Sequence, residues 1–130
     1  TQGCAGAGPG GNAPVDTQAP AAVDVRPRNV DAFNAGTAAL RAGDLATAER
    51  LLAAVTEDQP ELAGPWLNLG QVYLAQDRTD AAHAAFERAV AANPANCDAR
   101  SELALLLRRQ GEFAAAEAHY RACLAARPDY

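Results

Sequence analysis

Cysteine and histidine are the residue types in this chain whose spacing could support chemistry. The three cysteines are Cys4, Cys97 and Cys123, and the two histidines are His83 and His119. Thiolates can bind metals, attack electrophiles or pair in disulfides, and neutral imidazole is a common metal ligand. No Cys-x-x-Cys or Cys-x-x-Cys-His motif occurs, and neither histidine has a partner at the spacing of a metal motif. We therefore expect no metal site. The remaining possibility is a disulfide, which depends on whether the fold brings two cysteines together.

Other catalytic signatures fail the same inspection. The stretch GAGPGG resembles a phosphate-binding loop in composition, but no strand precedes it and no lysine follows it. All eleven basic residues are arginine, which excludes chemistry that needs a lysine amine. The carboxylates are expected on solvated helix faces. The sequence therefore predicts a protein without catalytic residues or a cofactor, and not an enzyme.

Composition points to a small helical protein. The chain has 130 residues, 49% apolar residues that are rich in alanine, and only 5% aromatic residues. Alanine is the best helix former, which favours an all-α body with close helix contacts. The net charge of −5 argues against a nucleic-acid partner. No apolar run approaches the roughly 18 residues that a membrane span requires.

The chain divides into two segments of different composition. Residues 1–28 contain five glycines among the first eleven residues, followed by spaced prolines, and show no helical period. We expect an extended tail there, because such a segment buries too little apolar surface to offset its ordering entropy.

From residue 29 the sequence repeats itself every 34 residues. The three units are 29–62, 63–96 and 97–130, and they align without a gap. Four columns of the alignment coincide: Gly36, Gly70 and Ala104; Ala48, Ala82 and Ala116; Pro60, Pro94 and Pro128; Leu52, Phe86 and Tyr120.

Each unit reads as two antiparallel helices. The first helix runs about 13 residues to a turn, where Gly43 and Gly111 suit a left-handed C-terminal position. The second helix ends at the proline that the three units share. The small residue Gly70 on a first helix can face Ala82 on the second, so that the two backbones approach closely.

The spacing of these residues resembles the tetratricopeptide repeat (TPR) family. The middle unit carries nearly the whole signature: Trp66, Leu69, Gly70, Tyr73, Ala82, Phe86, Ala89 and Pro94. The resemblance implies a right-handed superhelix of about six helices whose first helices line a concave groove. It also implies protein–protein interaction without catalysis.

The groove does not suit the carboxylate clamp that some TPR domains form. The third unit places Asp98 and Glu102 where that clamp requires cations, and they would repel a carboxylate ligand. Asn34 and Asn68 are read as structural residues of the repeat. The predicted groove wall is mildly apolar and comprises Phe33, Thr37, Leu40, Leu67, Gln71, Leu74, Ser101, Leu105 and Arg108.

Repeat geometry brings two of the cysteines together. Ala104 faces Ala116 across the antiparallel helices of the third unit. Cys97 lies two turns before Ala104, and Cys123 lies two turns after Ala116, so Cys97 and Cys123 should also face each other. A Cα separation of roughly 4.4–6.8 Å would permit a disulfide. We favour a disulfide, which would stabilise by roughly 2–4 kcal/mol and implies an oxidising compartment. The alternative is two buried free thiols in a cytosolic protein.

The unpaired Cys4 suggests an intermolecular bond or a modification. TQGC is similar to the end of a bacterial lipoprotein signal, but Thr1 stands where leucine is usual, and processing would remove residues 1–3. The chain has no methionine, which favours a removed signal peptide or a trimmed chain. The expectation is a bacterial protein exported to the periplasm or beyond, with its signal peptide removed.

The third unit ends without a further helix to cover it, and its apolar end face would include Tyr120, Leu124 and Tyr130. The first unit has alanines where the others have bulky residues, so the two ends differ in shape. A heterologous contact between such ends builds filaments. We expect end-to-end self-assembly into a filament or oligomer, with the tail docking on a neighbour. The alternative is a fragment of a periplasmic or lipid-anchored adaptor that binds partner segments in its groove.

Overall fold

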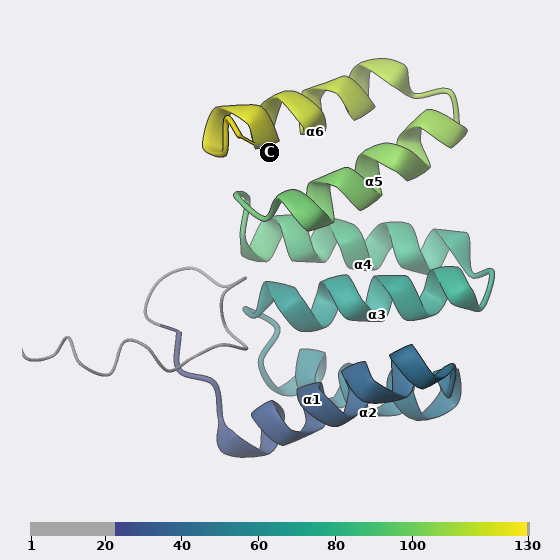
Figure 1. The fold of residues 1–130 in the computed structure, drawn as a ribbon, viewed down its shortest axis with the longest axis vertical. Helices are drawn as coiled ribbons and strands as arrows, with labels where there is room; N and C mark the ends of the chain where they lie inside the picture. The colour runs from purple at the N-terminus through teal and green to yellow at the C-terminus, as the bar shows by residue number, and fades with distance from the viewer. Residues whose placement is uncertain (1–22, 130) are drawn as a thin grey trace, which may run out of the picture.

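The computed structural model describes residues 23–129, which form a stack of helices. Neighbouring helices are packed in chain order, from α1 and α2 at one end of the stack to α6 at the other (Figure 1). No strand occurs within that range. The helices are α1 (Pro27–Ala42), α2 (Leu45–Asp58), α3 (Ala63–Ala75), α4 (Thr79–Ala92), α5 (Cys97–Arg109) and α6 (Phe113–Ala126).

The helix starts agree closely with the sequence period. Helices α3 and α5 begin at residues 63 and 97, where the second and third units were predicted to begin. Helix α1 begins at Pro27, two residues inside the segment predicted as tail. Proline suits the first helical turn because its φ is already helical and its missing N–H has no partner there. The tail prediction otherwise falls on residues 1–22, outside the described residues.

The turn inside each pair uses a left-handed residue. Gly43 and Gly111 have φ of 83°, and Asp77 takes the equivalent position with φ of 60°. This conformation lets a backbone N–H after the helix reach back into the last turn, as in the Arg78 N–H bond to the Tyr73 carbonyl at 2.8 Å. The predicted left-handed role of both glycines is therefore confirmed.

Side chains cap two of the helices, α2 and α5. The Asp44 carboxylate accepts a hydrogen bond from the Thr47 backbone N–H at 3.3 Å, and the Asn96 side chain accepts one from the Ala99 N–H at 3.0 Å. Each satisfies a backbone donor that the first helical turn leaves without a partner.

Close approach between the helices of the first two pairs depends on glycine in the first helix. A methyl group on Gly70 would lie 2.5 Å from Cε1 of Phe86, and one on Gly36 would lie 2.8 Å from Cγ of Leu52. The large side chains of α2 and α4 thus lie directly over the backbone of the preceding helix. The sequence placed Ala82 opposite Gly70, whereas it is the Phe86 ring that fills this space.

A polar clasp fixes the start of α1 to the end of α2. The Asn29 amide donates to the Asp58 carboxylate at 2.7 Å and to the Gln59 side-chain oxygen at 2.8 Å. Arg26 and Arg28 bind the same carboxylate at 2.9 and 2.7 Å. The hydrogen bonds from Asn29, Arg28 and Arg26 lower the pKa of Asp58 to about 2. The clasp holds Asp58 ionised and sets the direction in which the chain enters α1.

Among residues 23–129, none of the helices combines the length and the apolar character needed to cross a bilayer.

Candidate interaction surfaces

The second helix of each pair presents an equivalent apolar face. On α2 this face includes Ala48 and Leu52, which pack with residues of α3. On α4 it includes Ala82 and Phe86, which pack with residues of α5. All four residues are fully buried. A face of this kind is therefore the site at which the next helix of the stack docks.

The same face on α6 has a different environment. Ala116 is buried against α5, but Tyr120 is only half-buried, Phe113 is 66% exposed and Leu124 is 52% exposed. Tyr120 occupies the repeat position of Phe86. Scattered exposed leucines need no explanation, but an exposed aromatic and a leucine on one helix face form a patch. We call Phe113, Ala116, Tyr120 and Leu124 the α6 face.

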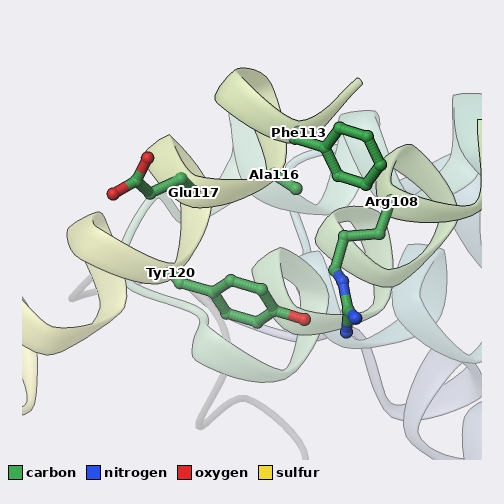
Figure 2. Close-up of a pocket in the computed structure, with 5 residues that line it drawn as sticks. All are labelled: Arg108, Phe113, Ala116, Glu117 and Tyr120. Carbon is green, nitrogen blue, oxygen red and sulfur yellow. The ribbon is translucent and has the colours of Figure 1, made fainter. Parts of the chain in front are cut away.

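A shallow pocket of about 320 Å³ lies on the α6 face. Its lining residues are Arg108, Phe113, Ala116, Glu117 and Tyr120. Figure 2 shows the Tyr120 hydroxyl directed toward the guanidinium group of Arg108, while the Glu117 carboxylate points away from both. The pocket combines aromatic side chains with the cation of Arg108.

Of the end-face residues predicted from sequence, the structure places Tyr120 and Leu124 on this face, and Tyr130 lies outside the described residues. Phe113 was missed. Its signal was present in the repeat, because Leu45 occupies the same position of the first unit and packs against the core cluster that α2 and α3 form.

The predicted groove wall is only partly available. Phe33, Thr37, Leu40, Gln71, Leu74 and Ser101 are half-buried, and Leu105 is 38% exposed. Leu67 is 6% exposed and belongs to the core cluster of α4 and α5, so its assignment to the wall is corrected. Arg108 is exposed and lines the α6 pocket.

Asn68 has the structural role that the sequence indicated. Its side-chain amide donates a hydrogen bond to the Thr37 hydroxyl at 2.9 Å, which joins α3 to α1. Asn34 is exposed on α1.

Helix α1 has small, exposed residues at the positions where α3 has the residues that pack against α2. Ala35 and Ala38 occupy the repeat positions of Leu69 and Val72, and both are exposed. Leu69 and Val72 are 2% and 0% exposed. The stack thus has bulky side chains free at one end and small ones free at the other.

Cys97 and Cys123 lie together at the start of α5 and the end of α6. Both are free thiols, each 2% exposed, and the Cys123 thiol donates to the Cys97 carbonyl oxygen at 3.6 Å. Burial, followed by the contact with Cys97, raises the pKa of Cys123 to about 12. The juxtaposition agrees with the sequence geometry, whereas the disulfide itself stays a prediction. Cys4 lies outside the described residues.

His119 joins α6 to α5 through a contact with Arg100. His119 Nδ1 lies 3.0 Å from the Arg100 guanidinium, and burial, followed by the charge of Arg100, lowers the pKa of His119. The neutral imidazole can therefore accept a hydrogen bond from Arg100. Within residues 23–129 no group of three or more histidine, cysteine, aspartate or glutamate side chains is arranged to hold a metal ion.

Helical pairs that repeat, dock through equivalent faces and turn on left-handed residues define a helical-repeat protein of the interaction class. The sequence profile of the tetratricopeptide repeat matches residues 33–81 and 67–130, which together make up most of the chain. The chain belongs to the tetratricopeptide repeat family. No curated protein sequence matches it.

Solved structures with the same fold include proteins of several kinds. The type III secretion translocator chaperone SycD of Yersinia enterocolitica, in an alternative dimer, is 16% identical with a TM-score of 0.72, covering 80% of this chain and 79% of its own. MamA is 26% identical with a TM-score of 0.69, and the match covers 78% of this chain and 60% of MamA. The first TPR domain of Spaghetti (RPAP3), bound to an HSP90 peptide, is 17% identical with a TM-score of 0.73, covering 85% and 87%.

Proposed function

We propose that this protein is a non-enzymatic interaction protein that assembles end to end, with helix α1 of one copy docked on the α6 face of another. The observation that carries the proposal is the exposure of Phe113 and Leu124 on a face whose equivalents on α2 and α4 are covered by the next helix. Family membership supports protein–protein interaction in general, and the choice of a second copy rests on the shapes of the two ends.

The two ends are complementary in side-chain size. In the stack, bulky residues of a second helix fit against the next first helix, as Phe86 does among Ala99, Leu103 and Leu106. On α1 the equivalent positions hold Ala35 and Ala38, which leave room for Tyr120 and Phe113 of another copy. Covering each large apolar side chain contributes roughly 1.5–3 kcal/mol before the costs of association.

The contact would be heterologous, because the α6 face meets α1 and not another α6 face. Such contacts produce rings where the rotation closes and filaments where it does not. The docking of the tail on a neighbour, an intermolecular bond through Cys4 and export of the protein remain further parts of the proposal, and they concern residues outside the described range.

The test is sedimentation equilibrium of the full chain across a hundredfold concentration range, in reducing buffer so that Cys4 cannot link copies. The mean mass should rise with concentration. Leu124→Asp and Ala38→Arg should each remain near the monomer mass, because each places a charge in the proposed contact. Both positions are exposed, so neither change disturbs the core.

Mixing the two variants distinguishes this geometry from a symmetric dimer. Leu124→Asp retains a functional α1 end and Ala38→Arg retains a functional α6 face, so an equimolar mixture should form heterodimers and nothing larger. A wild-type chain that stays monomeric throughout would overturn self-assembly and assign the α6 face to a helix of another protein or of an adjoining segment.

A second candidate is a periplasmic or lipid-anchored adaptor whose concave groove binds an extended segment of a partner. Leu105 favours it, because it is 38% exposed among half-buried residues of the first helices. The Spaghetti domain shows that a fold of this kind can hold a peptide. Leu105→Asp serves as the matched control: it should leave self-assembly unchanged, whereas loss of assembly in this variant and not in Leu124→Asp would favour the groove.

A further inference from the structure

The first residue of α5 meets a residue in the last turn of α6. Cys97 and Cys123 take the repeat positions of Ala63 and Ala89. Both alanines are fully buried, and the two cysteines are each 2% exposed. Both positions are thus buried in the last two pairs, and in the last pair the fold brings a thiol at each position together.

The contact joins the two ends of the α5–α6 pair. Cys97 is the first residue of α5, and Cys123 lies in the last turn of α6, 26 residues later. The Cys123 sulfur is 3.6 Å from the Cys97 carbonyl oxygen, so it lies against the Cys97 backbone. A bond between the sulfurs would close a hairpin of helices at its open end, opposite the turn at Gly111.

We propose that Cys97 and Cys123 form a reversible disulfide site that fastens α6 to α5. The oxidant is a small-molecule disulfide. One protein thiolate attacks a sulfur of that molecule, which forms a mixed disulfide and releases the first small thiol. The second protein thiolate then attacks the mixed disulfide, which forms the Cys97–Cys123 bond and releases the second small thiol. The two protons lost by the protein end on the two released thiols.

Burial makes this site slow to react while the pair is closed. The thiolate is the attacking species, and a buried thiol that donates to a carbonyl has little thiolate and no path for the oxidant. Reaction therefore requires the last turn of α6 to open. Helix ends open at low free energy cost, and α6 has no helix packed on its outer face within the described chain. The site is thus protected but not inaccessible.

Once formed, the bond should suppress that opening. A disulfide that closes a loop of this length stabilises mainly by limiting the open state. Amide hydrogen exchange in α6 should slow on the order of 100-fold, and exchange in α1 and α2 should not change, because those helices do not contact the site.

The experiment uses the full chain with Cys4→Ser, incubated with oxidised and reduced glutathione in varying ratio and then trapped with acid. Intact mass should show a species 2 Da lighter than the reduced chain (two hydrogens lost), and peptide mapping should join Cys97 to Cys123. The matched control is Cys97→Ala with Cys123→Ala, which reproduces the Ala63 and Ala89 pair of the middle repeat. It should fold and show no effect of oxidant on exchange in α6.

Three results would overturn the proposal. One is a chain that keeps two free thiols under oxidising ratios that oxidise a reference protein dithiol. Another is accumulation of stable glutathione adducts without the 2 Da loss. The third is a bond that forms without slowing exchange in α6 relative to the reduced chain. The mass and peptide-mapping readouts are independent of self-association, and exchange is compared at a concentration where the chain is monomeric. Failure of the assembly proposal would therefore leave this one intact, and the reverse also holds.

Discussion

The middle and last helix pairs of this molecule share a pattern but differ in what covers them. In the middle pair, Phe86 is fully buried between its own first helix and α5. In the last pair, Tyr120 at the same repeat position is half-buried beside a shallow pocket. Whether a repeat residue belongs to the core or to the surface therefore depends on the helix that packs against it.

The largest contrast should come from truncating these two equivalent side chains. Phe86→Ala should lower the free energy of unfolding by about 3–5 kcal/mol, because it empties a buried space that the surrounding helices cannot fill. Tyr120→Ala should cost about 1 kcal/mol or less at concentrations where the chain is monomeric, because one side of that ring already contacts solvent. Urea unfolding followed by circular dichroism measures both, and equal losses would contradict the distinction.

The close approach in the middle pair gives the next effect. Gly70→Ala gains about 1 kcal/mol in helix propensity but places a methyl group 2.5 Å from the Phe86 ring. We expect a net loss of about 1–2 kcal/mol from overpacking. Adding Phe86→Leu, the residue type that Leu52 supplies in the first pair, should recover part of it. If the two changes are additive in a double-mutant cycle, the contact is not the cause.

Much of this architecture could be predicted from the sequence, because the 34-residue period fixes helix pairs, turns and small-residue contacts together. The left-handed glycines, the start of α3 and the meeting of Cys97 with Cys123 all follow from that period. One assignment was wrong and one residue was missed, because the repeat pattern does not specify how deeply a side chain is buried. Leu67 was assigned to the groove wall, but its side chain packs in the core. Phe113 was overlooked because its exposure depends on whether a helix packs beyond α6.

The turn of the last pair should show a smaller effect. Gly111→Ala should lower the free energy of unfolding by about 1 kcal/mol, because a residue with a Cβ is strained at φ of 83°. The neighbouring Gln110→Ala is the control, since Gln110 is exposed and has φ of −90°; its effect should stay within about 0.5 kcal/mol. Indistinguishable losses in thermal unfolding would mean that the left-handed turn is not needed here.

The smallest effect should occur at the first end of the stack, where the clasp depends on an ionised Asp58. Its pKa is lowered from 3.8 to about 2 by Asn29, Arg28 and Arg26. A folded-state pKa below the unfolded value means that the contribution is complete above about pH 4 and is lost as the pH falls from there toward 2.

Asp58→Asn removes this titration but keeps a side chain of similar shape. The stability difference between wild type and Asp58→Asn should be constant above pH 5 and shrink between pH 4 and 2, as measured by chemical unfolding across that range. Asp31→Asn is a suitable control, because Asp31 is an exposed carboxylate on α1, the helix whose start the clasp holds. A difference that does not change with pH would mean that the arginines hold the start of α1 through geometry alone and that ionisation of Asp58 contributes nothing.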